Sequence, residues 1–452
     1  MEMLQIVIVL ESLGLAVPLG MTAVWFYSRS GRIMDLRVFG LLTIIWFYCM
    51  PGILGAFSPT ILRFVIPLER PNVMMPVALS LPLMVISVLA GLLIRWGPSK
   101  QPSLKRQRQV AREASRRYHL GRLFLFSLLC LGLAICGAWK ELHAVGGWFG
   151  VIHGGGKAYL EARVTKVLGI WGVALTLFPI AAIGLMYCAV RNRILPPGLR
   201  LPAAVTIFFG STGVVALLTA RHLIFMLLFT GIALLEIRSK AFFRLAVPVI
   251  LLVIAVGAFG LGTFRYSSNV QARDEILGNF EHIQIAERIA ANVQIGGYIW
   301  GGNIPDLVTF LVPRSIWPNK PMGNRISRTV FVEYAKIGGV KVPGMIGEAY
   351  ASAGLVGVAL EGFIYGVLLR RLAAFWDRRR GNHLQFASFG SVLLGFIYLS
   401  VHFGMFGPQD STFVTGLLQI YVITHFCGYL RRDTFPRTVI AVPAQQDALA
   451  VT

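Results

Sequence analysis

The chain is poor in charged residues and especially poor in acidic ones. Only 14% of its 452 residues are charged, and 20 Asp and Glu stand against 42 Lys and Arg. A soluble globular protein carries about 25% charged residues, so this composition excludes a water-soluble fold of the same size. The five cysteines form no CxxC pair and no Cys/His spacing typical of zinc. The sequence therefore predicts neither a disulfide framework nor a metal site.

Nucleotide-binding motifs are also missing. The sequence holds no P-loop and no Rossmann glycine fingerprint, which disfavours nucleotide-driven chemistry and predicts no cofactor. Apolar sequence is abundant instead, since 56% of the residues are hydrophobic. A membrane-spanning helix needs about 20 mostly apolar residues. We therefore expect an all-α, polytopic integral membrane protein with about eleven transmembrane helices and one large periplasmic loop.

Eleven apolar runs predict these helices. Their approximate limits are 4–27, 38–58, 73–95, 120–139, 167–190, 201–219, 223–237, 245–264, 349–369, 385–405 and 413–430. The seventh run is short and the turn around Arg221 and His222 is tight, so a re-entrant hairpin is an alternative there. Residues 1–27 have no basic n-region and no small-residue cleavage site, which favours an uncleaved helix over a signal peptide.

Basic residues gather on alternate loops. The stretches 28–37, 95–122, 191–200, 237–244, 370–383 and 431–437 together hold 26 of the 42 Lys and Arg. Cytoplasmic loops collect Lys and Arg, so the N-terminus is predicted to be periplasmic and the C-terminus cytoplasmic. The densest cluster, 105–122, fits a cytoplasmic surface beside anionic lipids. Partner or nucleic-acid binding is the alternative, but no interleaved aromatics support it. Most of the net charge of +22 is therefore explained by basic residues on the predicted cytoplasmic loops.

The predicted spans divide the chain into four parts. Residues 1–263 carry helices one to eight, 264–348 form the large periplasmic loop, 349–430 carry the last three helices, and 431–452 form a cytoplasmic tail. The loop holds nine Lys and Arg against seven Asp and Glu, and because positive-inside bias does not explain basic residues on the outer side, these need a local explanation. Residues 274–293 predict an amphipathic helix on the membrane surface. The residues that fall near helical spacing are Ile276, Phe280, Ile283, Ala286 (or Glu287 in its place), Ala290 and Val293.

The segment 313–321 of this loop, PRSIWPNKP, is the most distinctive motif. Three prolines in nine residues forbid a regular helix, so a stiff loop presents Arg314, Trp317 and Lys320. Arg and Lys suit phosphate. The flat face of Trp suits a sugar or a membrane interface. Anchoring at the headgroup layer is the alternative role for all three residues.

Other ionisable residues lie at or within the predicted spans. Glu348 precedes a long apolar run, where the helix dipole stabilises a carboxylate; a role as general base or sugar-hydroxyl acceptor is the alternative. Arg221 has no acidic neighbour in sequence, and an ionisable residue at membrane depth is a functional-site hypothesis. Arg265, His402 and Asp410 lie on the same predicted periplasmic side of the membrane as Arg221. Two predicted spans also contain Glu11 and Glu361. Each of these taken alone is more often a helix-packing residue.

Four elements together resemble the Wzy-type O-antigen and exopolysaccharide repeat-unit polymerases. They are Pro313–Pro321, Gly347–Tyr350, Gly354–Gly357 and Thr219–Arg221, the last one residue tighter than the family's junction. The resemblance covers mainly residues 215–370. It implies a GT-C-like, lipid-linked glycosyltransferase of the bacterial inner membrane that needs neither metal nor nucleotide.

The resemblance also implies a reaction and roles for individual residues. A growing glycan would move from undecaprenyl diphosphate onto a new lipid-linked repeat unit at the periplasmic face, in O-antigen or exopolysaccharide synthesis. Glu348 would accept the proton, with His402 as second choice. The diphosphate would be held by Arg221, Arg265, Arg314 and Lys320, and the sugar by Trp317 and Tyr350. Implied partners are the undecaprenyl diphosphate-linked oligosaccharide, the bilayer and, as a further candidate, a chain-length regulator. O-antigen ligase is the alternative function, followed by a lipid-linked glycan transporter or flippase.

Overall fold

The computed structural model describes about half of the chain. The described residues are 3–30, 35–57, 71–94, 120–144, 147, 177–191, 196, 198–199, 282–302, 317, 326, 330, 343–378 and 383–405. Every regular element among them is a helix. Five of these helices are long and apolar enough to cross a membrane. The described part is therefore that of an all-α, multi-pass membrane protein, as the composition predicts.

These five candidate spans correspond to the first four predicted spans and the ninth. They are α1 (Met3–Ser30), a second span built from α2 (Leu36–Ile44), the π-helical turn η1 (Ile45–Cys49) and α3 (Met50–Phe57), then α5 (Pro71–Leu93), α7 (Leu120–Ala144) and α19 (Gly344–Asp377). Three further helices are α10 (Phe178–Arg191), α15 (His282–Gly296) and α20 (His383–Phe403). The predicted spans at 201–219, 223–237, 245–264 and 413–430 lie outside the described residues, and so does the alternative hairpin at Arg221.

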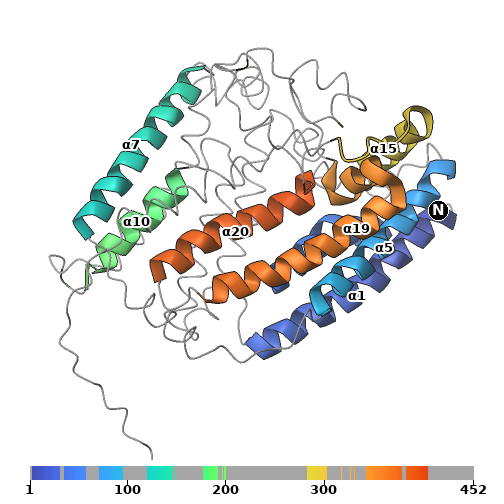
Figure 1. The fold of residues 1–452 in the computed structure, drawn as a ribbon, viewed down its shortest axis with the longest axis horizontal. Coiled ribbons are helices and arrows are strands. Elements are labelled where there is room, and N and C mark those ends of the chain that lie inside the picture. The colour runs from blue at the N-terminus through green and yellow to red at the C-terminus, as the bar shows by residue number, and fades with distance from the viewer. Residues whose placement is uncertain are drawn as a thin grey trace, which may run out of the picture.

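Among the helices that the structure describes, α5 and α19 pack most extensively against each other, and the pair lies beside α1 and α20 in Figure 1. A Cβ atom on Gly366 of α19 would overlap the carbonyl oxygen of Val88 in α5, and one on Gly91 of α5 would overlap the carbonyl oxygen of Phe363. Small residues let helix backbones approach closely in membrane proteins. The glycines of the long helix therefore place its backbone directly against α5.

The second span contains a π-helical turn just before Pro51. Proline has no N–H, and its ring conflicts with the carbonyl four residues earlier, here that of Phe47. The turn at Ile45–Cys49 absorbs this conflict and leaves Phe47 and Tyr48 buried. Single π-turns inside helices often mark functional sites.

α19 is in fact two helices joined by a sharp bend. Ala353 (φ −157°, ψ 31°) and Gly354 (φ 62°, ψ −144°) have non-helical backbone angles, and the angles of Gly354 are accessible to glycine alone. A Cβ atom on Gly357 would overlap the carbonyl oxygen of Ala349, although eight residues of straight helix rise about 12 Å. Residues 344–352 therefore turn back against the long segment 355–377. The predicted position of Glu348 at the start of a long helix is corrected accordingly: Glu348 belongs to this short segment.

α15 lies within and slightly beyond the range predicted for an amphipathic helix. Its side chains Ile283, Ala286, Ala290 and Val293 are buried. The helix packs against α19 and α5, so its apolar face lies against protein. This differs from the prediction of a helix whose apolar face contacts the membrane surface.

Candidate functional site

Three helix ends meet at one end of the bundle. α15 and α19 begin there and α20 ends there (Figure 1), and the contacts of Phe47 place the π-helical turn η1 next to them. The first N–H groups and the last C=O groups of a helix have no partner within that helix. A junction of helix ends therefore gathers polar backbone groups in a buried place, and side chains must satisfy them. We call this place the helix-end junction, defined by Tyr48, His282, Glu348 and His402.

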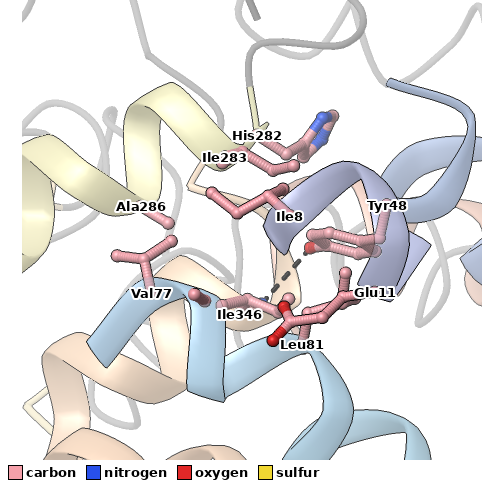
Figure 2. Close-up of a pocket in the computed structure, with 10 residues that line it drawn as sticks. Ile8, Glu11, Tyr48, Val77, Leu81, His282, Ile283, Ala286 and Ile346 are labelled. Carbon is pink, nitrogen blue, oxygen red and sulfur yellow. Dashed lines mark hydrogen bonds between the residues drawn. The ribbon is translucent and has the colours of Figure 1, made fainter. Parts of the chain in front are cut away.

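The hydroxyl group of Tyr48 links α19 to α20. It donates a hydrogen bond to the carbonyl oxygen of Val401 at 3.2 Å and accepts one from the backbone N–H of Ile346 at 3.2 Å. A tyrosine hydroxyl has one proton to donate and can also accept, so both functions are used here. The ring of Tyr48 is buried, and Figure 2 shows its bond to Ile346.

His282 and His402 form the second polar contact of the junction. The Nε2 atom of His282 lies 3.0 Å from the carbonyl oxygen of His402 and 3.0 Å from Nδ1 of the same residue. The ring of Phe47 stacks on His402, with 4.7 Å between ring centroids, and lies 5.0 Å from the His282 ring. His282 is buried and His402 is half-buried. The π-helical turn thus supplies the aromatic wall that holds both imidazoles.

Glu348 is fully buried, and it lies against the residue that ends α20. Gly404 has φ +103°, which favours glycine, and its N–H bonds to the carbonyl oxygen of Ser400 at 3.1 Å, as in a helix C-cap. A Cβ atom on Gly404 would overlap the carboxylate of Glu348. The two residues predicted as proton acceptors, Glu348 and His402, are therefore brought to the same junction by the end of α20.

Glu361 extends the acidic region deeper into the bundle. It is buried on the long segment of α19, and it lies near enough to Glu348 and to the Tyr48 hydroxyl for an electrostatic interaction with each. Thirteen residues of straight helix would separate Glu348 and Glu361 by about 20 Å along the axis, so the bend at Gly354 makes them neighbours. Within the part of the chain that the structure describes, Oε2 of Glu361 has no hydrogen-bond partner.

A small pocket lies beside the junction. Most of its walls are apolar, and its polar members are Glu11, Tyr48 and His282 (Figure 2). Oε2 of Glu11 has no hydrogen-bond partner among the residues described. The apolar walls come from α1, α5, α15 and α19, with Ile8, Val77, Ala78, Leu81, Ile283, Ala286 and Ile346. Glu11, interpreted from the sequence as a helix-packing residue, therefore borders a cavity.

A chain of aromatic contacts begins at Tyr350 in the short segment of α19. The ring centroid of Tyr298 lies 6.4 Å from that of Tyr350 and 5.6 Å from that of Trp300. The loop after α15 is tied to the bend by backbone hydrogen bonds of 2.9 Å, from Ile299 N–H to Ala351 O and from Trp300 N–H to Ser352 O. Trp300 is 75% exposed. Tyr350, predicted to contact sugar, thus has one aromatic neighbour, Tyr298, which in turn contacts Trp300; the sequence did not single out either of them.

The remaining predicted site residues are described only in part. Trp317 is 39% exposed, and the predicted diphosphate ligands Arg221, Arg265, Arg314 and Lys320 lie outside the described residues. Over the described ranges, no three His, Cys, Asp or Glu side chains are placed to hold a metal ion.

Sequence reasoning missed His282 and Tyr48. His282 lies in an amphipathic helix and Tyr48 in an apolar run, where neither residue type is exceptional. The available signal for Tyr48 was Pro51, which disturbs the helix one turn earlier.

The fold and the junction together define a class of protein. It is a multi-pass, helical membrane protein with a buried carboxylate, two paired histidines and a tyrosine at one end of the bundle. No protein-family model, no curated protein and no solved structure matches the chain. The function is therefore argued from the residues themselves.

Proposed function

We propose that this protein is a polysaccharide polymerase of the bacterial inner membrane. It transfers a growing glycan from undecaprenyl diphosphate onto a new lipid-linked repeat unit at the periplasmic face. The proposal rests on the resemblance of residues 215–370 to Wzy-type polymerases and on the chemistry available at the helix-end junction. Its GT-C-like architecture, with about eleven spans and a large periplasmic loop, belongs to the same proposal.

The placement of Glu348 is the observation that carries the proposal. Glycosyl transfer from a diphosphate needs a group that accepts the proton of the attacking sugar hydroxyl. Glu348 is a carboxylate in a fully buried position, and it lies against Gly404, two residues after His402 in the chain. A site closed to water favours transfer to a bound sugar hydroxyl over hydrolysis. This supports a role for Glu348 as the proton acceptor.

The bond changes of the proposed reaction balance without a further reactant. The hydroxyl oxygen of the incoming repeat unit bonds to the anomeric carbon of the growing glycan while the bond from that carbon to the diphosphate breaks. The hydroxyl proton passes to Glu348, and undecaprenyl diphosphate leaves with the bond's electron pair. Cationic side chains stabilise the leaving diphosphate, the role that the resemblance implies for Arg221, Arg265, Arg314 and Lys320.

The helix directions also support a periplasmic site. α1, α5 and α19 begin near the junction and α20 ends there. The alternation of basic loops predicts the periplasmic side for each of these helix ends. The junction and the predicted periplasmic face therefore coincide.

The direct test incubates the purified protein in lipid vesicles with undecaprenyl diphosphate-linked repeat units and resolves the products by gel. We expect a ladder of increasing chain length. Glu348→Gln keeps the shape and the hydrogen-bonding capacity of the side chain but removes the acceptor, so chain growth should fall by a factor of about 10²–10⁴. Glu287→Gln is the matched control, because Glu287 is also a buried glutamate but lies on α15 outside the junction.

Three outcomes would contradict the proposal. A normal ladder from Glu348→Gln would exclude the proton-acceptor role. Transfer of glycan to a lipid A core acceptor, with no ladder from repeat units alone, would identify a ligase. Movement of lipid-linked glycan across the vesicle without any transfer would identify a flippase.

A further inference from the structure

We propose that His282 is a positioning residue that fixes the tautomer of His402. Neutral His402 then carries its proton on Nε2 and serves the site as a hydrogen-bond donor. This inference deepens the proposed function, because it concerns a residue of the same site. Its spectroscopic test does not depend on polymerase activity.

The first step concerns the proton on His282. Its Nε2 atom lies 3.0 Å from the carbonyl oxygen of His402, and a carbonyl oxygen can only accept. An unprotonated Nε2 would place two lone pairs against each other in a buried position. Nε2 of His282 therefore carries a hydrogen and donates it to this carbonyl.

The helix end explains why this carbonyl needs a donor. His402 lies in the last turn of α20, where carbonyl groups have no partner within the helix. The preceding carbonyls are occupied, since Ser400 O accepts from Gly404 N–H and Val401 O accepts from Tyr48. His282 supplies the next bond in this series. Its orientation is thus set by the backbone of α20 and not only by the facing imidazole.

The second step concerns the proton on His402. The same N–H of His282 lies 3.0 Å from Nδ1 of His402, so it is shared between two acceptors, as is common at helix ends. Nδ1 must then offer its lone pair. In a neutral imidazole only one nitrogen carries hydrogen, so the hydrogen of His402 lies on Nε2.

The surrounding packing keeps His282 in this orientation. Gly344, with φ +66°, leaves no room beside the ring, because a Cβ atom there would come within 2.6 Å of Cδ2 of His282. Phe47 packs against both imidazole rings. His282 is buried, whereas His402 is half-buried. The inner histidine is therefore the fixed member of the pair, and the outer one is partly exposed.

The two predicted proton acceptors, Glu348 and His402, therefore have different roles. The basic nitrogen of neutral His402 faces His282, so proton acceptance belongs to Glu348. His402 instead offers an N–H donor. In the proposed reaction, such a donor suits a phosphate oxygen of the leaving diphosphate. The prediction of His402 as second choice for the base is revised in this way.

The test reads the tautomer directly by ¹⁵N NMR. The full-length protein is labelled with ¹⁵N-histidine, placed in lipid bilayers and studied at a pH where the histidines are neutral. The chain has eight histidines, and the signals of His402 are identified by their loss in His402→Gln. We expect the Nε2–H tautomer of His402 to exceed the other by more than about tenfold, the preference that one buried hydrogen bond sustains.

Two variants of His282 make the test specific. His282→Ala should bring the two tautomers of His402 to comparable populations. His282→Gln keeps an N–H donor near the position of Nε2 and should restore the preference. Thermal melting of both variants shows whether the fold is retained. A dominant Nδ1–H tautomer in the unaltered protein, or an unchanged preference in a folded His282→Ala variant, would overturn the inference.

Activity measurements separate this inference from the proposed function. If the protein polymerises repeat units, His282→Ala should lower kcat and His282→Gln should recover most of it. A protein that makes no polymer but shows the predicted tautomers would contradict the function and leave the role of His282 intact. Polymerisation together with the opposite tautomer would do the reverse.

Discussion

The two segments of α19 are held in place in opposite ways. The long segment, 355–377, lies against α5 through glycines that bring the two backbones together, and its buried side chains Val358, Tyr365, Leu369, Ala373 and Trp376 belong to the hydrophobic core. The short segment, 344–352, is held by the hydroxyl of Tyr48, by the loop after α15 and by the fit of Glu348 against Gly404. One stretch of chain thus contributes both a packed scaffold and a polar junction.

The difference shows where function can reside in this protein. Lipid offers no hydrophobic driving force between helices, so shape holds the long segment in place. Irregular backbone at membrane depth is tolerated only where protein covers it or where it lines a cavity, and the bend at Gly354 meets this condition. Buried ionisable groups are costly there and are typically functional. The short segment is therefore the part in which we place the chemistry.

The largest expected effect comes from breaking the scaffold with Gly366→Leu. The new side chain would overlap the backbone of α5 at Val88 and would begin 2.8 Å from the nitrogen of Leu92. Overpacking costs about 1–3 kcal/mol where side chains can adjust, and a backbone neighbour cannot. We expect loss of folded, monodisperse protein in size-exclusion chromatography.

Gly132→Leu is the control for this scaffold variant. A Cβ atom on Gly132 of α7 meets nothing within 4 Å, so the same substitution should leave the melting temperature nearly unchanged. Normal melting of Gly366→Leu would show that close contact between α5 and α19 does not hold the long segment.

A smaller effect on stability but a large one on activity is expected from Gly354→Ala. Alanine at φ 62°, ψ −144° is strained, which costs about 1–3 kcal/mol, and its Cβ would come within 2.7 Å of the Tyr298 hydroxyl. The short segment should shift and carry Glu348 away from Gly404. Chain growth should stop while the long segment stays packed.

Gly20→Ala is the matched control for the bend, because a Cβ atom there has open space. Melting temperature and gel ladder together decide the outcome. Unfolding as severe as that of Gly366→Leu would show that the two segments cannot be separated. Full activity in a folded Gly354→Ala variant would show that the bend is not needed for the site.

The sequence predicts the packed helices well and the polar junction only in part. Long apolar runs predict α1, α5 and α7 closely, because lipid demands such runs. Glu348 and His402 stood out because an ionisable residue beside or within an apolar run is unusual. The bend at Gly354 could not be foreseen, since the glycines around it equally fit a continuous, closely packed helix.

The partners in the junction were equally hidden from the sequence. His282 pairs with a residue 120 positions away, and Tyr48 bonds to one 353 positions away. Such contacts depend on which helix ends meet, and hydrophobic periodicity does not report that. The sequence could still predict that the backbone N–H and C=O groups at the helix ends would need partners, because these groups have none within their own helix.

The smallest expected effect comes from Tyr48→Phe, which removes one hydroxyl group and keeps the ring. The N–H of Ile346 and the carbonyl of Val401 would lose the partner that joins α19 to α20. An unsatisfied buried group costs about 1–3 kcal/mol, so the melting temperature should fall modestly and the amide of Ile346 should exchange with solvent faster. Tyr27→Phe, at an exposed tyrosine of α1, is the control and should change neither.

Activity distinguishes a linking role of Tyr48 from a chemical one. Because Glu348 stays in place, a purely linking Tyr48 predicts slower chain growth in Tyr48→Phe that remains well above the level of Glu348→Gln. A loss as complete as that of Glu348→Gln, with melting unchanged, would place the Tyr48 hydroxyl in the reaction. The reacting groups would then include Tyr48 beside Glu348 and the histidine pair. Unchanged exchange at Ile346 would instead show that the Tyr48 hydroxyl does not hold the short segment. The hydrogen bonds from the loop after α15 to Ala351 and Ser352 would then be the polar contacts that fix this segment, in contrast to the packed long segment.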